Sequence, residues 1–114
     1  MSANALLATG ITSRIFIIEL VYVNWKNKRI HAVGIKGTGT SGLAILLKKE
    51  GAVISGSDTE EEFPSEEELR KNGIEIKNFS RENISKDLDL VIYSGAWVEQ
   101  EETKKALELG IKSL

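Results

Sequence analysis

The sequence contains no cysteine, one histidine and one proline among its 114 residues. Without cysteine, the chain has no disulfide framework, no thiolate metal site and no cysteine nucleophile. A single histidine also excludes a metal site built from several histidines, and we assign no metal-binding residues.

Long hydrophobic runs and an excess of either charge are also missing. The most apolar segment, residues 15–23, is nine residues long and contains Glu19, whereas a membrane-spanning helix needs about 20 apolar residues. Lysine and arginine total 15 against 17 aspartates and glutamates, which gives a net charge of −2. Nucleic acids and anionic membranes bind clustered positive charge, so we expect neither as a partner. Residues 15–23 also make a poor secretory signal, because a charge interrupts the apolar run. We therefore expect a cytoplasmic protein.

One small domain fits the length of the chain, and the sequence pattern places it at residues 29–114. Residues 1–28 are interpreted as a leader, an extra strand or a segment added for expression. Short apolar runs then alternate with segments of helical period. This order predicts an α/β fold, a Rossmann-like open parallel sheet of about five strands with helices on both faces. The expected strands are 30–35, 52–57, 74–77, 88–93 and 111–114, and the expected helices are 41–50, 65–72 and 101–109.

Small and polar residues mark the ends of these helices. Gly51, Gly73 and Gly110 follow the three helices, at the position where a glycine often ends a helix. Ser65 and Glu68 match a capping box, which predicts that the second helix begins at Ser65. The polar residues 80–87 are expected to form a turn with a fragment of helix.

The glycine-rich segment 30–44 is the most informative part of the sequence. Gly37, Gly39 and Gly42 fit G-x-G-x-x-G between an apolar strand and an apolar helix, and Asp58 follows 21 residues after Gly37. Such a turn lets a phosphate approach the backbone, while the N-terminus of the helix supplies free N–H groups and a partial positive charge. We therefore predict a ligand that carries a nucleoside diphosphate.

Polar residues around this turn allow more than one interpretation. Thr38 and Ser41 would add hydroxyl donors, and Lys36 would either add positive charge or point into solvent. Asp58 would bond a ribose hydroxyl or the base, unless it is a plain loop carboxylate.

Three other features have structural explanations that we favour. His31 lies inside a strand and is expected as a core histidine bonded to the backbone. Trp97 could stack on a base or sugar, but packing at the edge of the sheet is favoured. The acidic residues 60–62 are expected as a solvated loop rather than as a Mg²⁺ site.

Six blocks of sequence add a more specific signal. They read IHAVGIKGTGTSGLA (30–44), VISGSD (53–58), LRKNGIEI (69–76), ENI (82–84), DLVIYSGA (89–96) and KALELGIKSL (105–114). In this order and spacing they resemble the N-terminal domain of the Mur ligases, the ATP-dependent enzymes that build the peptide stem of peptidoglycan. Within the family, the resemblance is greatest to the ligases that join L-alanine to UDP-N-acetylmuramate.

The resemblance implies that this domain holds UDP-N-acetylmuramate and contains no catalytic residue. Three departures from the family pattern are visible: Lys36 where a glycine is usual, Thr40 where a methionine is common, and no histidine in the loop 78–81. The implied binding residues are Gly37, Thr38, Gly39, Thr40, Ser41 and Gly42 around the pyrophosphate, Asp58 and Thr59 at the uracil end, and Ser94, Gly95 and Ala96 along the uridine or sugar.

The family's chemistry also implies what this sequence does not contain. In the full-length enzyme, ATP and Mg²⁺ activate the substrate carboxylate as an acyl phosphate, which needs a P-loop of the type G-x-x-G-K-[ST]. No such loop occurs in this sequence. We therefore expect a binding domain without a cofactor of its own, inactive alone, whose partners are the missing central ATP-binding and C-terminal domains.

Other identities remain open at the level of sequence. One alternative is the NAD-binding Rossmann module of a dehydrogenase or a transport regulator, because Asp58 would suit NAD. Another is an interaction module that keeps the fold and has lost its ligand. A third is the domain of a murein-tripeptide salvage ligase, which shares the same blocks.

Overall fold

The computed structural model describes residues 23–114. Nearly all of the apolar segment 15–23, and most of the segment assigned to 1–28, lie outside the described residues. Within 23–114, four strands form one parallel sheet in the order β3-β2-β1-β4. The strands are β1 (Arg29–Val33), β2 (Val53–Asp58), β3 (Ile76–Asn78) and β4 (Leu90–Tyr93).

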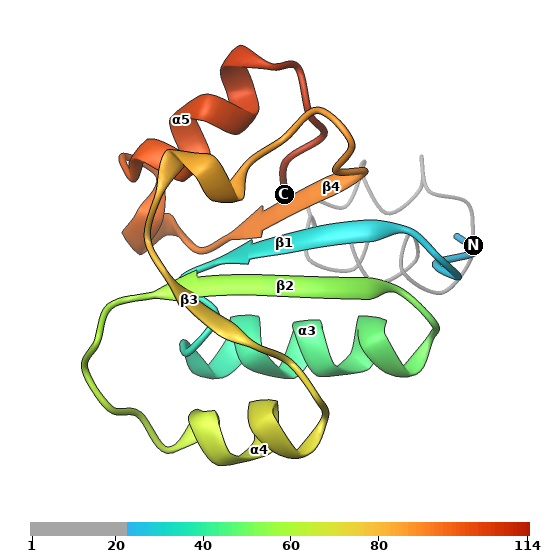
Figure 1. Ribbon diagram of the computed structural model, residues 1–114, viewed down its shortest axis with the longest axis vertical. Coiled ribbons are helices and arrows are strands. Elements are labelled where there is room, and N and C mark those ends of the chain that lie inside the picture. The colour runs from blue at the N-terminus through green and yellow to red at the C-terminus, as the bar shows by residue number, and fades with distance from the viewer. Residues whose placement is uncertain (1–22) are drawn as a thin grey trace, which may run out of the picture.

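Helices cover both faces of this sheet, as predicted. The helices α3 (Thr38–Lys49) and α4 (Ser65–Lys71) lie on one face, and α5 (Glu101–Glu108) lies on the other (Figure 1). There are also two short 3₁₀ helices, η1 (Arg81–Asn83) and η2 (Gly95–Trp97). The first packs against α5, and the second lies just before α5 in the chain. The fragment of helix expected within 80–87 is therefore confirmed.

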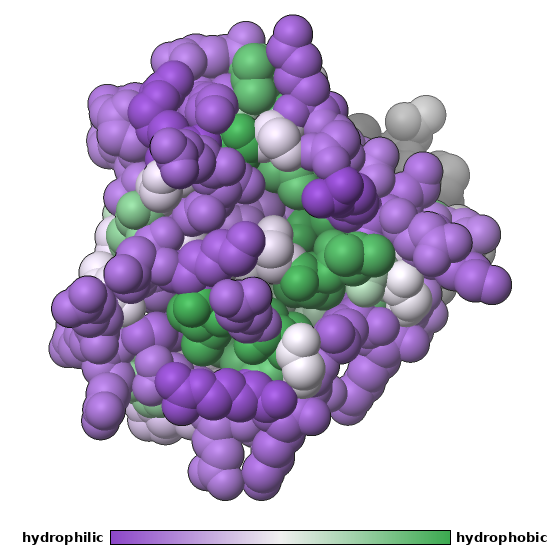
Figure 2. Space-filling model, in the orientation of Figure 1, coloured by the Kyte–Doolittle hydropathy of each residue, from purple (hydrophilic) through white to green (hydrophobic). Residues whose placement is uncertain are grey.

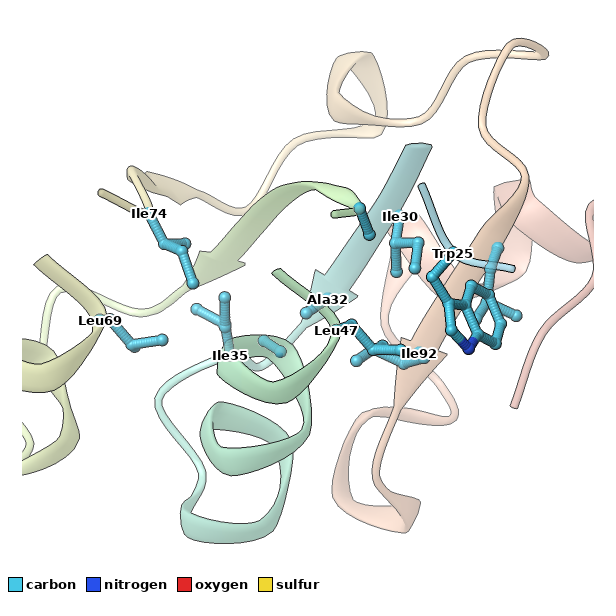
Figure 3. Packing of buried hydrophobic residues seen from close by; sticks show 11 residues of the cluster. Trp25, Ile30, Ala32, Ile35, Leu47, Leu69, Ile74 and Ile92 are labelled. Carbon is cyan, nitrogen blue, oxygen red and sulfur yellow. The ribbon is translucent and has the colours of Figure 1, made fainter. Parts of the chain in front are cut away.

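The alternation of side chains along the strands produces two apolar clusters. In β1, Ile30 and Ala32 face α3, while Val33 packs on the side of α5. The larger cluster fills the space between the sheet and α3 and α4 (Figure 3). Its buried members are Trp25, Ile30, Ala32, Ile35, Ala44, Leu47, Ala52, Leu69, Ile74, Leu90 and Ile92.

Gly56 is required by the packing of this larger cluster. A Cβ added at Gly56 would lie 2.3 Å from Cδ1 of Ile35, closer than real Cβ contacts allow. The side chain of Ile35, which follows β1, therefore lies directly against the backbone of β2. This contact brings the turn after β1 close to the end of β2.

The sheet has four strands rather than about five. The expected fifth strand at 111–114 is reduced to a single bridge between Val91 and Ser113. Leu114 pairs beside it, since its N–H donates to Val91 O and its carbonyl accepts from Tyr93 N. The last residues therefore continue the sheet beyond β4, although only this short stretch pairs.

The predicted helix ends lie within one residue of those observed, and two of the three predicted starts, 65 and 101, are exact. Gly51, Gly73 and Gly110 have φ values of 99°, 71° and 71°, the left-handed conformation that ends a helix. The start of α3 is three residues earlier than predicted, because Gly37 is its N-cap and Ser41 N donates to Gly37 O over 2.8 Å.

The second helix begins at Ser65, as predicted, but the predicted capping box is wrong. Pro64 is the N-cap, and no side chain caps the helix. The hydroxyl of Ser65 donates instead to the carbonyl oxygen of Lys36 over 2.5 Å. A contact between distant segments has thus replaced the local one.

Hydrophilic residues cover most of the face shown in Figure 2, and hydrophobic residues gather near its middle, where Figure 1 places the strands. Among residues 23–114, no helix has the length and apolar character needed to cross a membrane.

Candidate functional site

The glycine-rich turn connects the end of β1 to the start of α3. Gly34 and Ile35 both donate their N–H groups to Ser57 O, over 2.9 and 3.0 Å, and Gly37 N donates to Gly34 O over 3.1 Å. These bonds tie the turn to the end of β2. They also fix the direction in which α3 begins.

The first turn of α3 is suited to bind an anion. By helix geometry, the N–H groups of Thr38, Gly39 and Thr40 have no partner within the helix, and the helix dipole places partial positive charge there. This turn contains no acidic residue, and Thr38 and Gly39 are exposed. A phosphate group could therefore accept hydrogen bonds from this backbone.

No packing contact requires a glycine at any of the three motif positions, 37, 39 and 42. A Cβ added at Gly39 or Gly42 would meet no atom within 4 Å. At Gly37 the nearest atoms would be Gly34 O at 3.5 Å and Thr40 Oγ1 at 3.8 Å, which are ordinary contacts. Since glycine weakens a helix by about 1 kcal/mol relative to alanine, a glycine at position 39 is unfavourable for the helix and is required by no neighbour.

The hydroxyl of Ser41 has a partner inside the helix. Ser41 is 6% exposed, and its Oγ donates to Thr38 O over 3.0 Å. The side chain is therefore not directed outward as the ligand donor that the sequence suggested. Thr38, by contrast, is exposed.

A pocket lies beside the start of α3, at the carboxyl end of β4. Its volume is about 330 Å³. It brings together three of the binding residues suggested by the sequence, Gly39, Thr40 and Ser94. Gly95 and Ala96 follow Ser94 in η2 and are exposed. The other lining residues are Leu43, Ile92, Tyr93 and Leu114.

Asp58 and Thr59 lie away from this pocket, at the end of β2. Asp58 is 3% exposed, and its carboxylate accepts hydrogen bonds from Lys36 N over 2.9 Å and Thr59 N over 2.7 Å. In the sheet, β2 and β4 are the two neighbours of β1. The suggested residues thus form two groups, one on each side of the start of α3.

Lys36 neither adds positive charge at the glycine-rich turn nor points into solvent, the two roles that the sequence suggested. Its side chain is 4% exposed, so it does not point into solvent. Its Nζ donates to the carbonyl oxygens of Thr59 and Glu61 and pairs with Glu66 at 2.6 Å. The ammonium group is therefore directed into the loop after β2. The hydrogen bond from Lys36 lowers the pKa of the Glu66 carboxyl.

His31 is a core histidine, as expected, but its partners are side chains rather than backbone. It is 1% exposed, and its Nε2 lies 2.6 Å from Oε1 of Glu102 on α5. Its Nδ1 lies 2.8 Å from Ser55 Oγ, and Ser57 Oγ donates to the same Glu102 oxygen over 2.6 Å. This group, called here the His31–Glu102 network, links β1 and β2 to α5.

Glu102 is the central residue of the network and was missed by the sequence analysis. Its other oxygen, Oε2, accepts from Ser80 N over 2.9 Å and from Asn83 Nδ2 over 3.1 Å. Burial raises the pKa of Glu102, but hydrogen bonds from His31, Ser57 and Ser80 outweigh this effect and lower it. Because Glu102 is 0% exposed, the network is closed to ligands and stabilises the fold.

Trp97 packs within the protein. Its ring lies 4.8 Å from that of Phe79, centroid to centroid, at an angle of 51°. It belongs to the second apolar cluster, with Val33, Ile84 and Val91. The favoured interpretation of Trp97 as a packed aromatic is confirmed.

Comparison with known proteins gives a consistent family signal. A family model described as "Mur ligase family, catalytic domain" matches residues 29–114. The UDP-N-acetylmuramate–L-alanine ligase of Lactobacillus acidophilus is 42% identical over 89 residues, which cover 76% of this chain and 20% of that enzyme. The chain thus spans about one fifth of the length of the curated relatives it matches.

Solved structures agree with this signal. The UDP-N-acetylmuramate-alanine ligase of Thermotoga maritima superposes with a TM-score of 0.65 at 34% identity, over 75% of this chain and 20% of that one. A murein peptide ligase of Psychrobacter arcticus superposes with a TM-score of 0.68 at 26% identity, over 77% of this chain and 19% of that one.

Proposed function

The chain belongs to the Mur ligase family, and from this premise we propose that it binds the UDP part of UDP-N-acetylmuramate. The observation that carries the proposal is Gly39. This glycine lies in the exposed first turn of α3, lines the pocket and is required by no neighbouring atom. A ligand phosphate that lies against the backbone would explain why no side chain is present there.

The proposed ligand extends across the start of α3. The pyrophosphate lies at Thr38, Gly39 and Thr40, where free N–H groups and the helix dipole favour negative charge. The uracil end extends toward Asp58 and Thr59 at the end of β2. The sugar extends the other way, along Ser94, Gly95 and Ala96. The arrangement follows the rule that ligands of parallel sheets bind beyond the carboxyl ends of the strands.

We assign binding rather than catalysis to this chain. The relatives are ligases, and such enzymes use ATP and Mg²⁺ to activate a carboxylate. The residues of this chain do not suit those groups, because the sequence has no P-loop lysine. Residues 23–114 also bring no three His, Asp or Glu side chains together as metal ligands. In the full-length enzyme, the central and C-terminal domains would supply ATP, Mg²⁺ and the site for L-alanine.

A calorimetric titration tests the proposal. We expect UDP-N-acetylmuramate to bind to this chain and NADH not to bind, because 42%-identical relatives are ligases of that UDP-sugar. Binding of NADH alone would instead support a dehydrogenase-type module. Binding of neither would contradict the proposal and favour a module that has lost its ligand.

Gly39→Ala tests the position of the pyrophosphate, and Gly42→Ala is its matched control. We expect Gly39→Ala to weaken UDP binding about tenfold or more, because its methyl group would lie where the phosphate approaches. The resemblance also implied Gly42 as a binding residue, but Gly42 does not line the pocket, so we expect Gly42→Ala to bind UDP more tightly than Gly39→Ala does. Neither new Cβ meets an atom within 4 Å. Both variants should therefore be as stable as the wild type, or more stable by up to about 1 kcal/mol.

Equal affinities of the two variants would contradict the proposed position of the pyrophosphate. Urea denaturation of both variants separates this result from a loss of folded protein.

A further inference from the structure

The backbone of Lys36 is bonded on both sides to the segment that follows β2. Its N–H donates to Asp58 Oδ2 over 2.9 Å, and its carbonyl accepts from Ser65 Oγ over 2.5 Å. Asp58 is the last residue of β2, and Ser65 is the first residue of α4. The two ends of the intervening loop, residues 59–64, are thus fixed to one residue of the glycine-rich turn.

The side chain of Lys36 holds the middle of the same loop. Its Nζ donates to Thr59 O over 2.8 Å and to Glu61 O over 2.7 Å, and lies 2.6 Å from Glu66 Oε1. An ammonium group has three N–H donors, and these three acceptors match them. The Phe63 ring lies 6.0 Å from Nζ and covers it further.

Loop 59–64 would be mobile without this anchor. Its residues are exposed and belong to no helix or strand. Connecting segments of this kind open locally at low free energy. Lys36 fixes the loop before any ligand is present, so its ordering does not have to occur during binding.

From these contacts we infer that Lys36 is a positioning residue that determines recognition of the base of a nucleoside diphosphate. It holds in place loop 59–64, which contains Thr59 and follows Asp58 directly. The inference rests on the proposed function, which places the base at that end of the site. The ammonium group of Lys36 is directed into the loop and away from the pyrophosphate position. Lys36 therefore affects binding of the base and not binding of the diphosphate.

Lys36→Met tests this role, with Lys48→Met as the matched control. Methionine keeps the apolar part of the side chain and removes the three donors. Lys48 also donates from Nζ to a carbonyl oxygen between elements, Gly73 O at 3.4 Å, but it lies outside the candidate site. The two variants therefore remove the same charge at different places.

Two measurements are made on the wild type and on both variants. Amide hydrogen exchange at Thr59 and Glu66, whose N–H groups donate to Asp58 Oδ1 and Phe63 O, reports whether loop 59–64 is held. Calorimetry compares UDP, CDP and inorganic pyrophosphate. For Lys36→Met we expect faster exchange at Thr59 and Glu66, about tenfold weaker UDP binding and a smaller preference for UDP over CDP. Pyrophosphate affinity should not change. Lys48→Met should match the wild type in every measurement.

Each other result overturns a stated part of the inference. Unchanged exchange in Lys36→Met would show that Lys36 does not hold the loop. An equal fall in UDP and pyrophosphate affinity would show that it does not act on the base. A wild-type chain that binds none of the three ligands would overturn the proposed function and, with it, the role of Lys36 in recognition. Amide exchange would still test whether Lys36 holds the loop.

Glu66→Gln is the second variant if Lys36→Met does not fold. It removes the charge of the ion pair and leaves the two hydrogen bonds from Nζ to backbone carbonyls. We expect a smaller increase in exchange at Thr59 than in Lys36→Met, with no change in pyrophosphate affinity. Exchange equal to that of the wild type would overturn a contribution of the ion pair to the anchor.

Discussion

Glu102→Ala is expected to lower the free energy of unfolding by about 3–5 kcal/mol at pH 7. Glu102 is 0% exposed, and its carboxylate accepts hydrogen bonds from β1, β2, η1 and the residue before η1. Its removal leaves the donors of His31, Ser57 and Asn83 buried or half-buried without their acceptor. Urea denaturation followed by circular dichroism measures the effect.

Glu101→Ala is the matched control for Glu102→Ala. The Glu101 side chain is 59% exposed and pairs with Arg81 at 3.1 Å. Exposed pairs of this kind contribute about 0–1 kcal/mol. A loss in Glu102→Ala no larger than in Glu101→Ala would contradict a structural role for the His31–Glu102 network.

The contribution of Glu102 should also depend on pH with a definite sign. Its pKa in the folded protein lies below the 4.5 of a free glutamate. The unfolded chain therefore binds a proton more readily, and stability falls on acidification. The full contribution is present above about pH 4.5 and is lost as the pH falls through the lower pKa of the folded state. The difference between wild type and Glu102→Ala should shrink in urea titrations from pH 7 to pH 3.

Features that depend on neighbouring residues in the sequence were predictable. The alternation of apolar runs predicted the parallel sheet and its helices, because burial on both faces favours continuous apolar strands. Gly51, Gly73 and Gly110 predicted the helix ends, because a left-handed residue at these positions requires glycine. The position of the glycine-rich turn was also predictable, because its glycines lie directly between an apolar strand and an apolar helix in the sequence.

Features that depend on contacts between distant residues were not predictable. The capping box failed because the Ser65 hydroxyl bonds to Lys36, 29 residues earlier. The side chain of Lys36 gave no local sign that it would be buried, since its partners lie between 23 and 30 residues later. Glu102 likewise pairs with a histidine 71 residues away. A lone histidine inside an apolar strand does signal a buried polar partner, although it does not identify that partner.

Gly34→Ala is expected to destabilise the chain for two separate reasons. Gly34 has a φ of 73°, a conformation that costs about 1–2 kcal/mol for a residue with a Cβ. The new Cβ would also lie 2.0 Å from Nε1 of Trp97, so the indole ring must leave its place beside Phe79. Overpacking of this kind costs about 1–3 kcal/mol more. Urea denaturation again gives the free energy of unfolding.

Gly110→Ala separates these two causes, because Gly110 has nearly the same φ, 71°, but no atom within 4 Å of an added Cβ. It should therefore show the backbone cost alone. The double variant Gly34→Ala with Trp97→Ala should lose less stability than the sum of its single variants, because the small side chain removes the overlap. If Gly34→Ala loses no more stability than Gly110→Ala, Trp97 does not hold a fixed position against the turn. A larger loss would mean that the packed tryptophan constrains the turn whose Gly34 carbonyl accepts from Gly37 N, just before the proposed phosphate position.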